Sequence, residues 1–355
     1  MKKINFLFAS AIMMAFAFGM QSCSQIEDNP APTPEPKDPI IEAVENGATL
    51  NELIAGFAKE NTLSLPAGAK VEIAEAITLD APLTIITNGE QPATIVAKAG
   101  IVTSQNIAFE NVVIDANEVA TPFIQLADFE LAEGEVSKKI DAVSFKDSYI
   151  FGLKYQLVYA NKQAYLVKAI NVENSIIAID GTNKKTTFDF NGGGNTELLS
   201  INNSTIYANP TNGQNGGFFS SQSGKEVTDL GGETFSISIT NSTLYNITNS
   251  KTVNSLRKNS QAYQMYVVKN NVVVDCGKSG QFLKGLNAGQ AGKDGNWDVD
   301  GNCFNFDGAV IAEQNVGSAE DNIKNSIDAV IAFADAANGD FTQSNAKAGD
   351  PRWIK

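Results

Sequence analysis

Asparagine and aspartate side chains near residue 300 follow the spacing of a calcium-binding loop. The loop positions are Asn296, Asp298, Asp300, Gly301 and Asp307. Oxygen ligands at these intervals, with glycine at the sharp turn, suit a Ca²⁺ ion. Apolar residues alternate with the carboxylates, however, and a strand at this place would send the carboxylates outward instead of around an ion. The segment predicts either a Ca²⁺ site or a strand, and no other cofactor is expected.

The residue types that are missing restrict the catalytic chemistry further. The 355 residues include no histidine, and the only arginines are Arg257 and Arg352. Catalysis by Ser-His-Asp or Cys-His groups and zinc ligation by histidine are therefore excluded. An enzyme that removes a proton beside a uronate carboxylate would need an arginine or lysine as its base. Arg257 lies in a predicted loop and Arg352 near the C-terminus, so the sequence assigns no catalytic residue.

The charge of the chain argues against polyanionic partners. Lysine and arginine number 26 against 40 acidic residues, a formal net charge of −14. Removal of residues 1–22, which include Lys2 and Lys3, would leave 24 basic and 40 acidic residues, a net charge of 24 − 40, or −16. Nucleic acid and anionic lipid are therefore not expected to bind.

A glycan partner would instead need aromatic side chains and a few polar groups. The aromatic candidates in and beside the loops are Tyr155, Tyr159, Phe218, Phe219, Tyr263 and Trp297. The alternative for each is a place in the core, where alternating aromatic residues of strands usually lie.

A strand–corner–strand unit recurs along the chain, most clearly at 236–250 (SISITNSTLYNITNS). Its corner residues are Asn111, Asp147, Asn174, Asn203, Asn241, Asn270 and Asn302, spaced 36, 27, 29, 38, 29 and 32 residues apart. Strands of the same direction at such intervals suit stacked parallel coils, because a two-residue hairpin cannot join parallel strands. Asparagine tolerates left-handed backbone at a corner, so these residues are expected to be structural.

The uneven spacing predicts extra loops between the copies. They cover about 128–140, 182–195, 209–232, 251–264 and 277–296. In solenoid proteins such insertions gather on one face, which is often the binding face. Any site is therefore expected on the loops and not on the corner asparagines.

Residues 1–22 are predicted to be an export signal, with two lysines before an apolar run that is shorter than the about 20 residues of a membrane-spanning helix. The end of this segment, MQSC, resembles a bacterial lipobox, which implies lipidation of Cys23. Glu27-Asp28 then resembles the surface-export signal of Bacteroidetes lipoproteins. Retention on the periplasmic face, or secretion with loss of Cys23, is the alternative.

Residues 23–45 are predicted to form a stalk, because five prolines between Asn29 and Pro39 favour an extended chain. Residues 46–355 are expected to form one domain. In that domain, Cys276 and Cys303 are predicted either to form a disulfide or to be two buried free thiols.

A helix at Thr49–Lys59, the short strands that follow it and the terminal motif AGDPRW carry a family resemblance. They resemble Bacteroidetes surface lipoproteins of uncharacterised function that have a pectate-lyase-like β-helix. The resemblance implies an all-β fold, a right-handed parallel β-helix with short capping helices. The second of these helices is expected at Ser326–Ala337.

Three functions remain open from the sequence. The first is non-catalytic binding of a polysaccharide at the outer membrane, linked to carbohydrate acquisition, with the lipid anchor as the only membrane contact. The second is a polysaccharide lyase, which the resemblance implies through its fold, although fold alone is weak support for an activity. The third is a structural or adhesin-like scaffold. The sequence does not determine the oligomeric state.

Overall fold

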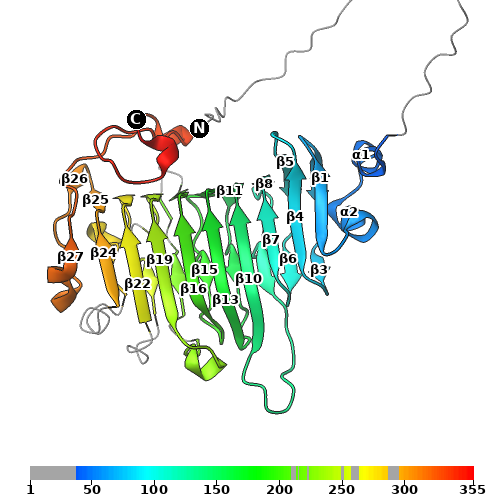
Figure 1. Cartoon of the computed structure of the whole chain (residues 1–355), viewed down its shortest axis with the longest axis horizontal. Helices are drawn as coiled ribbons and strands as arrows, with labels where there is room; N and C mark the ends of the chain where they lie inside the picture. The colour runs from blue at the N-terminus through cyan, green and yellow to red at the C-terminus, as the bar shows by residue number, and fades with distance from the viewer. Residues whose placement is uncertain are drawn as a thin grey trace, which may run out of the picture. The chain divides into compact units, whose positions relative to one another are not determined.

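The computed structural model describes residues 37–208, 213–214, 216–221, 224–248, 252–256, 264–286 and 296–355. Parallel strands stack coil upon coil along one axis (Figure 1). The predicted all-β parallel β-helix is therefore confirmed. Contacts group Asp38–Lys355 into one compact unit.

The coils contribute strands to three sheets, which we call A, B and C in chain order, and among the described residues the coils after β21 contribute to sheets A and B alone. Sheet A contains β1 (Thr62–Pro66), β4 (Leu83–Asn88), β7 (Ile107–Glu110), β10 (Lys138–Lys146), β13 (Tyr165–Glu173), β16 (Asn195–Asn202), β19 (Phe235–Thr240), β22 (Gln264–Lys269), β24 (Trp297–Asp300) and β27 (Ile323–Lys324). Sheet B contains β2 (Lys70–Ile73), β5 (Ala93–Ala97), β8 (Val112–Asp115), β11 (Tyr149–Leu153), β14 (Ile176–Ile179), β17 (Thr205–Ala208), β20 (Thr243–Tyr245), β23 (Val272–Val274), β25 (Cys303–Phe306) and the antiparallel β26 (Ala309–Val310). Sheet C contains β3 (Ile77–Leu79), β6 (Ile101–Thr103), β9 (Ile124–Leu126), β12 (Val158–Tyr159), β15 (Phe188–Asp189), β18 (Phe219–Ser220) and β21 (Asn254–Ser255).

Alternating side chains of these strands fill the inside of the solenoid. In β19, Ile237 and Ile239 point inward and are 1% exposed, and Ile237 is paired with Leu199 of the coil before it. Phe109 and Phe145 stack in the same way, with ring centroids 5.5 Å apart. Because like residues lie in register from coil to coil, their side chains form one continuous core. Each fully buried aliphatic side chain contributes about 2 kcal/mol of apolar transfer free energy to it.

Two helices, α1 (Pro39–Glu45) and α2 (Leu50–Phe57), close the N-terminal end. The capping box predicted at Thr49 and Glu52 forms, and Leu50 is fully buried against the first coil. Helix α1 lies within the segment predicted to be a stalk, and its Val44 packs on the core. Pro39 occupies a first-turn position of the helix, where proline needs no amide partner, so the folded unit begins before residue 46.

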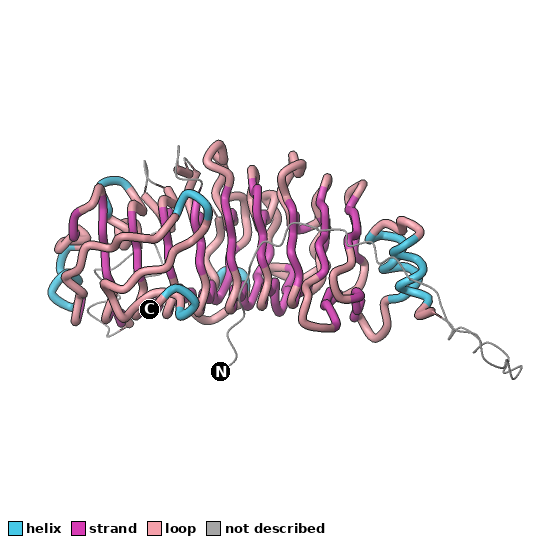
Figure 2. Tube along the Cα trace, turned by 90° about the horizontal axis from the view of Figure 1, so that it is seen from above, coloured by secondary structure: helices cyan, strands magenta, loops and turns pink. Residues whose placement is uncertain are grey.

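The second capping helix, predicted at Ser326–Ala337, does not form. Residues 326–333 belong to no helix or strand, and the 3₁₀ turn η5 (Ala336–Asn338) follows them. The apolar residues Ile327, Ala329, Ile331 and Phe333 alternate with a period of two and pack on the outer face of sheet B. We call residues 326–355 the tail. In Figure 2 loop segments cross the strands in the C-terminal half of the solenoid.

The corner residues adopt the expected left-handed backbone, with φ between 48° and 54° at all but the last predicted position. At that last position the left-handed residue is Gly301 (φ 65°) and not Asn302. The residues that directly follow the corners form a buried ladder of hydrogen bonds along the solenoid. In each rung, the backbone N–H of one of these residues donates to the side chain of the equivalent residue in the next coil. The rungs are Ser148–Ser175 (3.1 Å), Ser175–Ser204 (3.1 Å), Ser204–Ser242 (3.2 Å), Ser242–Asn271 (2.9 Å) and Asn271–Asn302 (3.0 Å).

Candidate functional site

The inserted residues leave the coils at the two corners that flank sheet C. One set connects sheets B and C, as between β14 and β15, and the other connects sheets C and A, as between β9 and β10. The second set forms the lower edge of the molecule in Figure 1. Two of its loops touch, because Ser137 Oγ donates to the carbonyl of Leu230 at 2.6 Å. Sheet C therefore lies between the two sets of loops.

The outer face of sheet C carries one row of aligned, mostly polar side chains. The row is Gln125, Tyr159, Asp189, Ser220 and Ser255, paired in register from β9 to β21. Their neighbours in sequence point into the core, as the pleat requires. Adjacent strands are about 4.8 Å apart, so the row extends over about 20 Å along the solenoid axis. We call it the sheet C row.

Carboxylate and amide groups surround Tyr159 in this row. Asp189 accepts hydrogen bonds from Gln156 Nε2 at 3.3 Å and from the backbone N–H of Asn191 at 3.0 Å. Burial raises the pKa of the half-buried Tyr159 phenol, and the charges of Asp189 and Asp128 raise it further. Tyr159 therefore stays a neutral donor and acceptor, with an apolar ring face, at ordinary pH.

Asp128 lies in the loop that follows β9, and its side chain bonds to the equivalent loop of the next coil, which follows β12. Its Oδ1 accepts from Asn161 Nδ2 and from Gln163 Nε2, both at 3.1 Å. These three polar groups come from two successive coils, so they extend the polar surface from sheet C toward sheet A.

Two of the predicted aromatic residues, Tyr155 and Tyr159, belong to one coil, and both are half-buried. Tyr155 lies in the turn between β11 and β12, where its backbone carbonyl accepts from the buried Asn183 Nδ2 at 3.0 Å. The structure thus places both tyrosines beside sheet C.

For Phe218, Phe219 and Trp297 the prediction of a sugar platform is wrong. Phe218 and Phe219 are fully buried, and their rings pack on Phe188 and Phe190 inside the solenoid. Trp297 is 6% exposed and meets Tyr266 edge to face. All three point into the core, which was the alternative that the alternation allowed. Tyr263 lies outside the described residues.

The segment at Asn296–Asp307 adopts the strand alternative, and the predicted calcium loop does not form. Residues 297–300 are strand β24, from which Asp298 pairs with Lys269 at 2.6 Å. Asp300 accepts from Asn325 Nδ2 at 2.8 Å, and the backbone N–H of Asp307 bonds to Asp275. In the described part of the chain, no three carboxylate or thiol groups converge as metal ligands.

Cys276 and Cys303 are both free, so the disulfide alternative is wrong. Cys276 lies inside the solenoid, whereas Cys303 points outward from sheet B, and its Sγ donates to the carbonyl of Ala329 in the tail. Burial raises the pKa of both thiols. Neither has the lowered pKa of a nucleophile.

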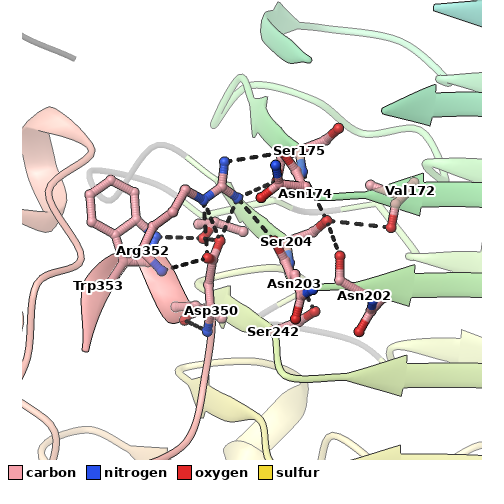
Figure 3. Close-up of polar contacts among 12 residues, drawn as sticks. Val172, Asn174, Ser175, Asn202, Asn203, Ser204, Ser242, Asp350, Arg352 and Trp353 are labelled. Atoms are coloured by element: carbon pink, nitrogen blue, oxygen red, sulfur yellow. Dashed lines mark hydrogen bonds and ion pairs between the residues drawn. The ribbon is translucent and has the colours of Figure 1, made fainter. Parts of the chain in front are cut away.

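The terminal motif Gly349–Trp353 fixes the tail to sheet B (Figure 3). The Asp350 carboxylate is fully buried and accepts from Thr205 Oγ1 at 2.7 Å. Arg352 Nε bonds to both carboxylate oxygens at 3.0 Å, while Nη2 reaches the carbonyl of Ser175 at 2.9 Å. Trp353 Nε1 donates to Thr205 at 2.7 Å. We call this group the latch.

Sequence reasoning missed most of the sheet C row and the buried ladder. Asp189, Gln125 and Ser220 stand in strands of two or three residues, which are too short for an alternating pattern to show. A serine or asparagine directly after five of the seven predicted corners was the available signal for the ladder, and Val112 and Cys303 follow the other two.

Comparison with known proteins adds a family model but no function. Residues 69–209 match the model described as Domain of unknown function (DUF4957), a range that ends just past β17. No curated protein matches the chain. Within the described residues, no helix has the length and apolar character needed to cross a membrane.

Proposed function

We propose that this protein binds a linear polysaccharide along sheet C without cleaving it. The observation that carries the proposal is the sheet C row, in which polar groups repeat at each coil around the ring of Tyr159. A polymer with a regular repeat is suited to a surface that also repeats along one axis. Sugar rings would contact the aromatic face, and hydroxyl groups would bond to the amides and carboxylates.

The lyase alternative has less support. It requires an arginine or lysine base next to carboxylates that hold Ca²⁺. Arg352 is bound to Asp350 and to backbone carbonyls in the latch, on sheet B, and Arg257 lies outside the described residues. Lysines remain as possible bases, but no three carboxylates converge to hold Ca²⁺ in the part of the chain that the structure describes, so we favour binding over catalysis.

We further propose that the protein acts at the outer membrane of a Bacteroidetes-type bacterium. The lipobox at Cys23 and the proline-rich segment after it support a lipid-anchored, surface-exposed location. A binding protein held there would serve carbohydrate acquisition. A structural or adhesin-like scaffold is the remaining alternative.

A glycan array, probed with the lipid-free protein and followed by an assay for unsaturated sugar products, tests this proposal. We expect specific binding of one class of polysaccharide with no product formed. Unsaturated product would support the lyase, and binding to a matrix protein without any sugar would support the scaffold.

A further inference from the structure

The tail crosses five successive coils on the outside of sheet B. Counted by their strands in this sheet, they are coil 5 (β14), coil 6 (β17), coil 7 (β20), coil 8 (β23) and coil 9 (β25). At coil 9 the backbone N–H of Ile327 donates to the carbonyl of Asn302 at 2.8 Å. At coil 5 Arg352 Nη2 donates to the carbonyl of Ser175 at 2.9 Å. The tail therefore runs back along the solenoid from its last coils toward its middle.

The tail also bonds to the three coils between these ends. The backbone N–H of Gly349 donates to the carbonyl of Asn270 in coil 8 at 2.7 Å. The backbone N–H of Asp350 donates to Thr243 Oγ1 in coil 7 at 3.0 Å, and the Asp350 carboxylate accepts from Thr205 Oγ1 in coil 6 at 2.7 Å. A short stretch of the tail is thus bonded to several coils at once.

Apolar side chains of the tail form a second hydrophobic cluster, separate from the core inside the solenoid. Phe341 is fully buried and packs on Tyr207 of coil 6 and Tyr245 of coil 7, with ring centroids 4.9 and 5.7 Å away. The buried members at coils 8 and 9 are Val272, Val274, Cys303, Ile331, Ala346 and Ala348. Apolar burial therefore joins these coils on the outside of sheet B as well as on the inside.

Contacts of this kind change how a solenoid opens. In repeat proteins each coil contacts only its neighbours, so a terminal coil can open while coils further away stay folded. The tail is one chain segment that bonds to coils that are not neighbours. Opening of coil 9 would break the contacts of residues 327–331, and a tail held at coils 5 and 6 opposes that opening.

We propose that the tail is a brace that makes coils 5 to 9 open and close as one cooperative unit. Its latch holds it at coils 5 and 6, where Arg352 bonds to the carbonyls of Asn174, Ser175 and Asn203 (Figure 3). Loss of these bonds is therefore expected to destabilise coil 9, which Arg352 does not touch. The brace concerns the solenoid itself and does not depend on the proposed glycan function.

Native-state hydrogen exchange of the whole protein, read by mass spectrometry, tests the brace with strand β24 as the reporter. This strand is the part of coil 9 in sheet A, and among the described residues the tail donates no hydrogen bond to it and accepts none from it. Faster exchange in β24 therefore reports opening of coil 9 and not the uncovering of sheet B. We expect Arg352→Met to exchange the β24 amides at least tenfold faster than the wild type, with β5 in coil 2 unchanged.

Thr196→Val is the matched control. Thr196 Oγ1 donates to the carbonyl of Val167 at 2.8 Å, so it joins coils 5 and 6 as Arg352 does, but through sheet A and without touching the tail. Its replacement should speed exchange in β13 and β16 and leave exchange in β24 at the wild-type rate.

Trp353→Phe is a milder second variant in case Arg352→Met does not fold. It removes the donor of the 2.7 Å hydrogen bond to Thr205, and thermal melting checks that both variants are folded. We expect its β24 exchange to lie between that of the wild type and that of Arg352→Met. Wild-type exchange of β24 in both latch variants would overturn the proposal. Equal acceleration of β24 by Thr196→Val would also overturn it, because the coupling would then pass from coil to neighbouring coil without the tail.

Discussion

Replacement of Arg352 by methionine is expected to release the tail from sheet B. The Asp350 carboxylate would stay fully buried but lose its guanidinium partner. Removal of one partner of a buried ion pair costs about 3 to 5 kcal/mol. Because the Arg352 side chain is 30% exposed, we expect a loss of about 3 kcal/mol, which is the lower end of that range. At 1.4 kcal/mol for each factor of ten, the open tail becomes about 100-fold more populated.

The thiol of Cys303 reports this opening directly, because Ala329 of the tail covers it. In a chain with Cys23→Ser and Cys276→Ala, Cys303 is the single thiol. When the tail opens and closes faster than the reagent reacts, the labelling rate is proportional to the population of the open tail. The labelling rate of Cys303 with a thiol reagent is therefore expected to rise about 100-fold in Arg352→Met.

Two controls separate loss of the ion pair from general damage. Arg352→Lys keeps a positive charge but loses the planar fork, so its labelling rate should fall between wild type and Arg352→Met. In the double variant Asp350→Asn/Arg352→Met no unpaired charge remains. Its increase in labelling rate should therefore be smaller than the product of the increases in the two single variants. An unchanged rate in Arg352→Met would refute the assignment of the latch.

Four further predictions concern stability. Gly349→Ala should lower the free energy of unfolding of the tail by more than 2 kcal/mol in urea titrations, whereas Gly308→Ala should cost only about 1 kcal/mol. Both glycines have positive φ, but only at Gly349 would a Cβ clash, at 2.9 Å from Thr243. Ser204→Ala should cost about 1 to 3 kcal/mol, because it leaves the Ser175 N–H buried without its acceptor, and the outward Ser200→Ala should be near neutral. Burial raises the pKa of Tyr165 to about 12 against about 10 unfolded, so stability should be lost as pH rises through this interval, and Tyr165→Phe should reduce that loss. Neither Ca²⁺ nor EDTA should change the melting temperature, since β24 forms no calcium loop.

The repeat pattern was sufficient to predict the solenoid, because each copy had to repeat the same alternation and the same left-handed corner. Asn174, Asn203 and Asn241 stand where the sequence placed them. The error at Asn302 arose because Gly301 takes the left-handed place there without an asparagine, and the aligned asparagine is a rung of the ladder.

Long-range packing explains what the sequence did not reveal. The alternation of Ile327, Ala329 and Ile331 is a strand-like period, but its partner surface is the outside of sheet B, which no local pattern indicates. For Phe219 and Trp297, the sequence left open whether each ring lies inside or outside. The structure decides this through the register of short strands, which depends on neighbouring coils.

Calorimetric titration of the protein with a panel of linear polysaccharides tests the central claim most directly. The account predicts that at least one polymer binds saturably, that Tyr159→Ala weakens this binding at least tenfold, and that no new reducing ends appear. Phe151→Ser, an outward aromatic on sheet B, is the matched control and should bind as the wild type does. Equal binding by Tyr159→Ala and the wild type, or release of new chain ends, would contradict the account.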